Sequence, residues 1–234
     1  MFATGVYRDA PAINAAMGRV YFHMMCAVIT SMLVSYVVGT NPVLSHFFLT
    51  GIMHWVVLFA PLVFIFIVPS ILESNPPAVV AVGTLHTFAG LMGLSLSVIF
   101  IAYAMTSIFT AFMGAAVLFG VMSFYGYFTK RSLEGMGSFL MVGLIAIIIA
   151  SLINIFVGST VMQMVISAIA ILIFLGFTAY DTQQIREQVA VATDDSMAIE
   201  IMGALNLYLD FINLLDRKST RLNSSHLGIS RMPS

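Results

Sequence analysis

Long apolar stretches run along almost the whole chain and are separated by short polar segments. A helix that crosses a bilayer needs about 20 mainly apolar residues, and these stretches reach that length. We therefore predict an all-α polytopic membrane protein, a bundle of seven transmembrane helices. The predicted spans cover residues 20–38, 47–70, 78–100, 104–128, 137–157, 160–181 and 198–215.

Turn-forming residues interrupt the apolar pattern between most of the predicted spans. These segments are Gly39-Thr40-Asn41-Pro42, Ser74-Asn75-Pro76-Pro77, Lys130-Arg131-Ser132 and Gly158-Ser159. The break between residues 100 and 104 lies inside a long apolar stretch, so the sequence marks it least clearly. Ala89, Gly93 and Ser97 recur at every fourth position of the third span, which predicts the close approach of a neighbouring helix.

The overall composition excludes a soluble domain. The 234 residues are 60% hydrophobic and only 8% charged, whereas soluble domains carry roughly 25% charged residues. So few charges cannot cover a water-facing surface, and the lipid bilayer is therefore the expected partner. The sequence contains no phosphate-binding loop, zinc-ligand spacing or basic nucleic-acid patch, so we expect no cofactor and no nucleic-acid partner. The single cysteine, Cys26, excludes an intramolecular disulfide.

The composition changes abruptly after Leu215, where an apolar helix gives way to a polar string rich in serine and arginine. Residues 216–234 resemble the in-frame translation of a sequencing adapter, so we predict that they form a non-native tail. A natural polar cytoplasmic tail is the alternative. On the adapter interpretation, residues 20–215 are the membrane domain, and the natural protein continues beyond its truncated last span.

The basic residues that precede the tail predict the orientation of the chain. With the N-terminus inside, the segments on the cytoplasmic side hold all of these residues, and the intervening loops hold none. The residues are Arg8, Arg19, Lys130, Arg131 and Arg186. The cytoplasmic segments are residues 1–19, 71–77, 129–136 and 182–197. Because Lys and Arg gather on the cytoplasmic side of membrane proteins, we predict a cytoplasmic N-terminal segment, residues 1–19.

Two aspartates on the last two predicted spans are the leading candidates for chemistry. A charge at membrane depth costs about 3 kcal/mol or more, so carboxylates that remain there are functional candidates. Asp181 ends the sixth span and Asp210 lies inside the seventh. Two carboxyls within hydrogen-bond reach cannot easily both ionise, so the pair can share a proton near neutral pH and act as a pH switch. For Asp181, a water-facing carboxylate at the helix end is the alternative.

The same two aspartates could bind a hard cation when both are ionised, since calcium prefers oxygen ligands. We therefore predict Asp181 and Asp210 as a possible calcium site. Two histidines, His54 and His86, lie in the second and third predicted spans. A neutral imidazole there could modulate a proton path, and the alternative is a core histidine with a satisfied hydrogen bond.

Several motifs resemble the Bax-inhibitor family of seven-span membrane proteins, in its bacterial form, and the resemblance covers most of residues 20–215. The motifs are Gly90-Leu91-Met92-Gly93-Leu94-Ser95-Leu96-Ser97, Phe124-Tyr125-Gly126-Tyr127-Phe128-Thr129-Lys130, Gly176-Phe177-Thr178-Ala179-Tyr180-Asp181-Thr182-Gln183 and Ala204-Leu205-Asn206-Leu207-Tyr208-Leu209-Asp210-Phe211-Ile212-Asn213-Leu214. The resemblance implies a location in the bacterial inner membrane and a pH-sensitive calcium leak channel. In such a channel, paired aspartates on the last two spans form a gate latch, which carries over here to Asp181 and Asp210.

The resemblance also leaves an alternative open, because some bacterial relatives modulate a membrane-bound AAA protease. Some members carry a basic residue on the second span that pairs with the latch, whereas this span has only His54. A third interpretation is an intramembrane aspartyl protease, suggested by Tyr180-Asp181 and the second aspartate. The Gly-x-Gly-Asp motif of such proteases is absent, so we do not expect an enzyme.

Overall fold

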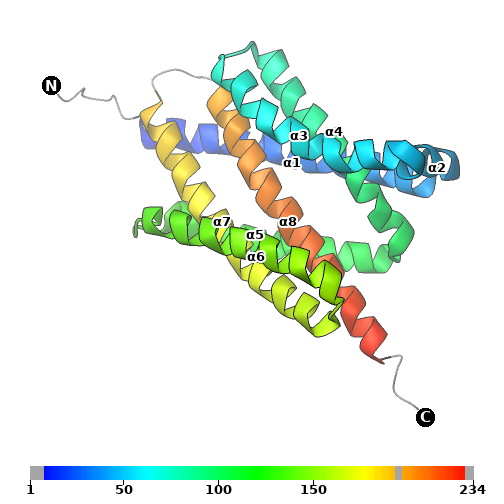
Figure 1. The fold of residues 1–234 in the computed structure, drawn as a ribbon. Coiled ribbons are helices and arrows are strands. Elements are labelled where there is room, and N and C mark those ends of the chain that lie inside the picture. Colours follow the sequence, from blue (N-terminus) through cyan, green and yellow to red (C-terminus); the bar gives the residue numbers. More distant parts are fainter. Residues whose placement is uncertain (1–7, 193–196, 230–234) are drawn as a thin grey trace. The chain divides into compact units, whose positions relative to one another are not determined.

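The computed structural model describes residues 8–192 and 197–229, with side chains described as far as Asp216. Every regular element in these ranges is an α-helix, as predicted (Figure 1). The helices are α1 (Ala10–Thr40), α2 (Pro42–Leu49), α3 (Gly51–Glu73), α4 (Ala78–Ala102), α5 (Met105–Phe128), α6 (Glu134–Val157), α7 (Thr160–Val191) and α8 (Met197–Ile229).

Seven of the described helices, all except α2, are long and apolar enough to cross a membrane, which confirms the predicted number of spans. The first helix begins at Ala10 and not at residue 20. Asp9 caps it, because the Asp9 side chain accepts a hydrogen bond from the amide of Ala12 at 3.2 Å. Pro11 stands in the first turn, where a missing amide hydrogen costs nothing.

The second span differs from the prediction, because it starts at Gly51 and the residues before it form the separate helix α2. Asn41 caps α2: its side-chain oxygen accepts hydrogen bonds from the amides of Val43 at 3.0 Å and Leu44 at 3.2 Å. Thr50 lies between α2 and α3, and Gly51, the first residue of α3, has a φ of +60°, a conformation that glycine adopts readily. The Asn41 cap thus begins a new helix after α1, and the break at Thr50 and Gly51 ends it before α3.

The predicted break inside the long apolar stretch is confirmed at Tyr103 and Ala104, between α4 and α5. Gly158, with a φ of 67°, ends α6 in the left-handed conformation, and its amide donates to the Asn154 carbonyl at 2.8 Å. The Asn154 side chain also bridges to α7, since its amide nitrogen donates to the side-chain oxygen of Gln163 at 3.1 Å. The predicted turns after α3, α5 and α6 all lie between helices.

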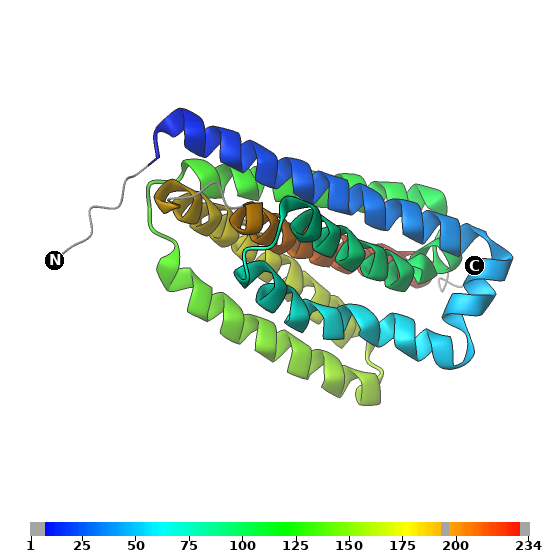
Figure 2. The same ribbon diagram turned by 90° about the horizontal axis from the view of Figure 1, so that it is seen from above.

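The chain divides into two compact units. Unit 1 comprises residues 1–105 and 185–208, and unit 2 comprises residues 106–184 and 209–234. Helices α7 and α8 each contribute residues to both units. In unit 1, α4 packs against both α1 and α3 (Figure 2).

Small residues allow α1 and α4 to approach closely, which confirms the expectation for the third span. A Cβ atom at Gly93 would come within 2.7 Å of the Ser31 carbonyl oxygen and 2.9 Å of the Val34 Cβ. A Cβ atom at Gly39 would likewise come within 2.7 Å of the Ser97 carbonyl oxygen. Since backbone atoms cannot move aside easily, a larger residue at either glycine would push the two helices apart.

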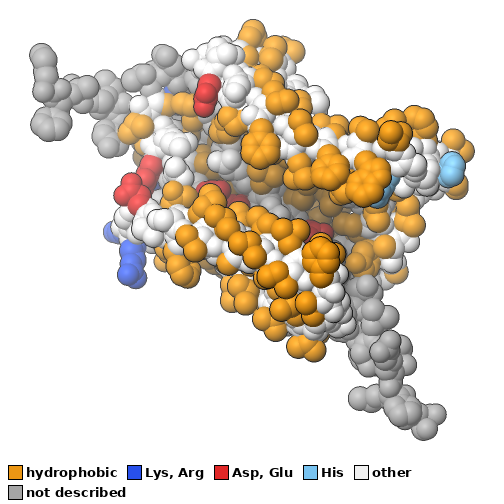
Figure 3. All heavy atoms as spheres, in the orientation of Figure 1, with side chains coloured by type: hydrophobic (Ala, Val, Ile, Leu, Met, Phe, Trp, Pro, Cys, Tyr) orange, Lys and Arg blue, Asp and Glu red, His pale blue; other side chains and the backbone are white. Residues whose placement is uncertain are grey.

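Large apolar side chains lie exposed along the spans, and hydrophobic atoms dominate the face seen in Figure 3. Ile52 is 83% exposed, Phe66 82% and Phe156 91%. In water such surfaces would drive aggregation, whereas in a bilayer they face lipid tails. The exposed apolar surface therefore agrees with an integral membrane protein.

The predicted tail begins at residue 216, and the backbone of α8 continues as a helix to Ile229. The side chains beyond Asp216 and residues 230–234 lie outside the described part of the chain, as do residues 1–7 and 193–196. The assignment of the tail as non-native therefore stays a prediction.

Candidate functional site

Asp181 lies on α7, in a stretch whose neighbouring side chains are fixed by hydrogen bonds within unit 2. The Thr178 hydroxyl donates to the Phe174 carbonyl at 2.8 Å, and the Thr182 hydroxyl donates to the Thr178 carbonyl at 2.7 Å. The Thr182 hydroxyl also meets the hydroxyl of Ser123 on α5, at 3.0 Å. Both threonines are fully buried, so the turn that carries Asp181 is tied to the interior of unit 2.

Close backbone packing holds the same turn from two other helices. A Cβ atom at Gly126 of α5 would collide with the carbonyl oxygen of Ala179. A Cβ atom at Gly137 of α6 would come within 2.7 Å of the Tyr180 ring. Glycine at these two positions thus allows α5 and α6 to pack directly on the residues that precede Asp181.

Gln183 completes this arrangement by binding the connection between α5 and α6. Its side-chain oxygen accepts a hydrogen bond from the Leu133 amide at 2.7 Å, and its nitrogen donates to the Arg131 carbonyl at 3.0 Å. The Gln183 side chain is buried, so both bonds are shielded from competing water. A glutamine has one acceptor group and one donor group, and here each satisfies one main-chain group of the loop.

Asp210 lies on α8 in the same unit and is only 5% exposed. Its Oδ2 atom is buried and has no hydrogen-bond partner among the described residues. Asp181 and Asp210 belong to the same unit, and Asp181 lies near enough to act electrostatically on Asp210. The neighbouring Asn213 uses its amide nitrogen on its own helix, donating to the Leu209 carbonyl at 2.8 Å.

The two predicted histidines both lie in unit 1. His86 Nδ1 is 2.9 Å from the hydroxyl of Thr30, and that hydroxyl donates to the Cys26 carbonyl at 2.9 Å. A hydroxyl has one hydrogen, so this arrangement assigns the proton of the shared bond to His86 Nδ1. His54 contacts Trp55 edge-on, with ring centroids 5.7 Å apart. The hydrogen bond of His86 is the one expected of a satisfied core histidine.

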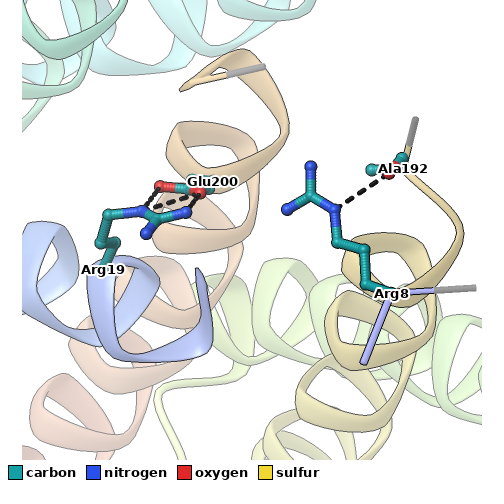
Figure 4. Close-up of polar contacts among 4 residues, drawn as sticks. All are labelled: Arg8, Arg19, Ala192 and Glu200. Atoms are coloured by element: carbon teal, nitrogen blue, oxygen red, sulfur yellow. Dashed lines mark hydrogen bonds and ion pairs between the residues drawn. The ribbon is translucent and has the colours of Figure 1, made fainter. Parts of the chain in front are cut away.

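An ion pair in unit 1 was not predicted from the sequence. The guanidinium of Arg19 on α1 binds the carboxylate of Glu200 on α8, with distances of 2.6–3.0 Å (Figure 4). Close by, Arg8 Nε donates to the Ala192 carbonyl at 3.0 Å. Glu200 is an acidic residue at the start of an apolar helix, and that position was the signal that a basic partner should be sought.

No group of three or more histidine, cysteine, aspartate and glutamate side chains that could hold a metal ion occurs in the described part of the chain. The possible calcium site at Asp181 and Asp210 therefore stays a prediction that rests on two carboxylates. Neither carboxylate belongs to a larger acidic cluster there.

Seven membrane-length helices in the described part of the chain and an apolar exposed surface define a polytopic α-helical integral membrane protein. Residues 13–217 match the family model described as Inhibitor of apoptosis-promoting Bax1. The chain therefore belongs to the Bax inhibitor family, as its motifs predicted.

Relatives in several bacteria support this assignment. The chain is 35% identical to the inner membrane protein YbhL of Escherichia coli over 213 residues, which cover 89% of this chain and 91% of that protein. It is 46% identical to an uncharacterised protein of Rickettsia prowazekii over 129 residues, and the match spans only about half of that protein, 55%. It is 41% identical to an uncharacterised membrane protein of Streptococcus pyogenes over 157 residues, 66% of that protein.

Proposed function

We propose that this chain is a pH-sensitive cation leak channel of the bacterial inner membrane, not an enzyme, in which Asp181 and Asp210 form the latch of the gate. The observation that carries the proposal is the buried Oδ2 atom of Asp210, which has no partner among the described residues and lies in the field of Asp181. A buried carboxylate oxygen without a partner is costly, so it is expected to be protonated or to meet a cation.

A latch needs its two groups on elements that hold them in a defined orientation. The turn that carries Asp181 meets this need, because buried hydroxyl bonds and direct glycine contacts fix it against α5 and α6. The helix that carries Asp210 is held by Phe211, whose ring meets Phe112 and Phe119 of α5 edge-on at 5.4 Å and 5.8 Å. Both carboxylates therefore project from packed helices and not from loops.

The proposed pH dependence follows from the charge of the pair. With one shared proton, the carboxyls attract one another and the closed state is stabilised. Loss of that proton at higher pH leaves two anions that repel, and closure loses its advantage. A second proton at lower pH gives a neutral pair with a weaker bond. Calcium, the proposed transported cation, should therefore leak at a rate that depends on pH on both sides of neutrality.

Calcium flux into dye-loaded liposomes, measured across pH, tests the proposal. The wild type should show the two-sided dependence, and Asp181→Asn and Asp210→Asn should each flatten it, since asparagine keeps the shape but not the titration. Glu187→Gln is the matched control, because Glu187 is an exposed acid on the same helix as Asp181 and should leave the profile unchanged. Identical profiles for the wild type and both asparagine variants would rule out the latch.

A further inference from the structure

A single buried hydroxyl in unit 1 joins three helices. The Ser31 Oγ atom of α1 lies 3.1 Å from the carbonyl oxygen of Ala27, one turn earlier on the same helix. It lies 2.8 Å from the carbonyl oxygen of Ala89 on α4 and 2.6 Å from the hydroxyl of Tyr208 on α8. Ser31 is 1% exposed and Tyr208 is fully buried, so water does not compete for these bonds.

The chemistry of the neighbours assigns the protons. The carbonyls of Ala27 and Ala89 can only accept, so the one hydrogen of Ser31 goes to one of them. The lone pairs of Ser31 Oγ are then available to Tyr208, whose hydroxyl is therefore the donor. Both hydroxyl hydrogens are used in hydrogen bonds only when the Tyr208 hydroxyl points at Ser31.

Aromatic contacts also hold the ring of Tyr208 in place. It meets Phe88 of α4 edge-on, with centroids 5.9 Å apart, and Phe88 in turn stacks on Phe64 of α3 at 6.4 Å. Gly93 supports the arrangement, because the absence of a Cβ atom there lets α4 approach the main chain of Ser31. Within unit 1, Tyr208 thus fixes the rotation of the first part of α8 with respect to α1 and α4.

Asp210 is two residues further along the same continuous helix. Two residues correspond to a rotation of about 200° around a helix axis, so Tyr208 and Asp210 point to opposite faces of α8. If α8 rotates or slides as one rigid helix, a movement that redirects Asp210 also breaks the bond between Ser31 and Tyr208. The ion pair between Arg19 and Glu200 joins the same two helices, α1 and α8, about 12 Å nearer the start of α8 than Tyr208.

We propose that Ser31 and Tyr208 are a positioning pair, which sets the rotation and depth of α8 and thereby the orientation of the Asp210 carboxyl. The inference rests on the proposed function for its consequence, the pH response of the latch. The orientation of the side chain at position 210 can be measured without a flux assay.

The first experiment measures that orientation as thiol reactivity. Asp210→Cys in a Cys26→Ala background gives one thiol, and its rate of reaction with a membrane-permeant maleimide is measured with and without Tyr208→Phe. Loss of one buried hydrogen bond, about 1 kcal/mol, should change the rate by about fivefold. Ser35→Ala is the matched control, because Ser35 is buried one turn after Ser31 and its hydroxyl has no partner among the described residues.

A double-variant cycle separates the specific bond from general damage. Tyr208→Phe and Ser31→Ala remove the same hydrogen bond, so their combination should change the thiol reactivity no more than the larger single variant does. An unchanged rate in Tyr208→Phe, an additive double variant, or an equal change in Ser35→Ala would each overturn the proposal.

Calcium flux then separates the two proposals. If the latch operates, Tyr208→Phe should displace the pH profile of the leak, whereas Ser35→Ala should not. A changed thiol reactivity, together with a wild-type flux profile for Asp210→Asn, would refute the latch and leave the positioning role standing. A normal flux profile for Tyr208→Phe in a protein whose latch variants do alter flux would refute the positioning role.

Discussion

Arg19 and Glu200 bind one another through two parallel hydrogen bonds, Nε to Oε2 at 2.8 Å and Nη2 to Oε1 at 2.6 Å. The pair joins α1 to the first turn of α8 within unit 1 (Figure 4). The Glu200 side chain is 6% exposed, whereas 45% of the Arg19 side chain is exposed. Removal of its partner therefore costs the buried Glu200 more free energy than it costs the half-exposed Arg19.

Loss of the arginine should cost more stability than loss of the glutamate charge. Arg19→Gln leaves a buried carboxylate without its cation, at a cost of about 2 kcal/mol. Glu200→Gln leaves an arginine that can reach the polar surface, and screening of that exposed group reduces the cost to about 1 kcal/mol. Unfolding of the purified protein in mixed micelles, titrated with a denaturing detergent, measures both values. Equal costs, or the reverse order, would contradict the predicted asymmetry.

Gly126 should tolerate no side chain, because a Cβ atom there meets the carbonyl of Ala179. We expect Gly126→Ala to separate α5 from α7 and to destabilise the protein by about 1–3 kcal/mol. Gly120→Ala is the control on the same helix, since nothing lies within 4 Å of its added Cβ atom. The control should be neutral or slightly stabilising, because alanine favours helix. Thermal unfolding in detergent compares the two, and similar results for both would refute the close contact.

Gln183 should control access to the loop between α5 and α6. Gln183→Ala removes both bonds to the loop and leaves the amide of buried Leu133 unpaired, at a cost of about 1–3 kcal/mol. The loop should then open more often, and trypsin should cleave sooner after Lys130 and Arg131. Gln184→Ala, at the exposed neighbouring position, is the control. Equal cleavage times for the two variants would show that the glutamine does not hold the loop.

The orientation of the chain in the membrane stays a prediction, and cysteine labelling tests it. In a Cys26→Ala background, Ser132→Cys and Gln188→Cys should react with an impermeant reagent from the cytoplasmic side. Thr160→Cys should react from the opposite side, because basic residues gather on the cytoplasmic face. Labelling of positions 132 and 188 from different sides of the membrane would exclude the predicted topology.

The polar end of the chain should contribute little to stability. Deleting residues 218–234, which lie beyond the match to the family, should change the free energy of unfolding in detergent by no more than a surface substitution does, about 0.5 kcal/mol. The reason is the absence of any apolar periodicity in this segment. A large loss of stability would show that the segment belongs to the fold.

The sequence by itself determined the class of protein and the number of spans. Length and hydrophobicity suffice for this, because a lipid solvent requires long apolar segments whose backbone groups bond internally. Most turns were also predictable, since Gly158 and the segment at Asn75 have local signals. The start of the second span was not predictable, because the apolar residues at the end of α2 and the start of α3 follow one another in the sequence, and only the backbone conformation at Thr50 and Gly51 divides them.

Asp181 and Asp210 stood out in the sequence because a carboxylate among apolar residues is costly wherever it points. Their polar neighbours did not, since serine, tyrosine and glutamine are common in helices and acquire a role only through what they face. Only the tertiary structure could decide that Tyr208 meets Ser31 and that Gln183 meets a loop 50 residues away. Hydropathy is a sum over neighbours in the sequence, so it can be calculated before the fold is known. A hydrogen bond acts over about 3 Å, between groups that only folding brings together.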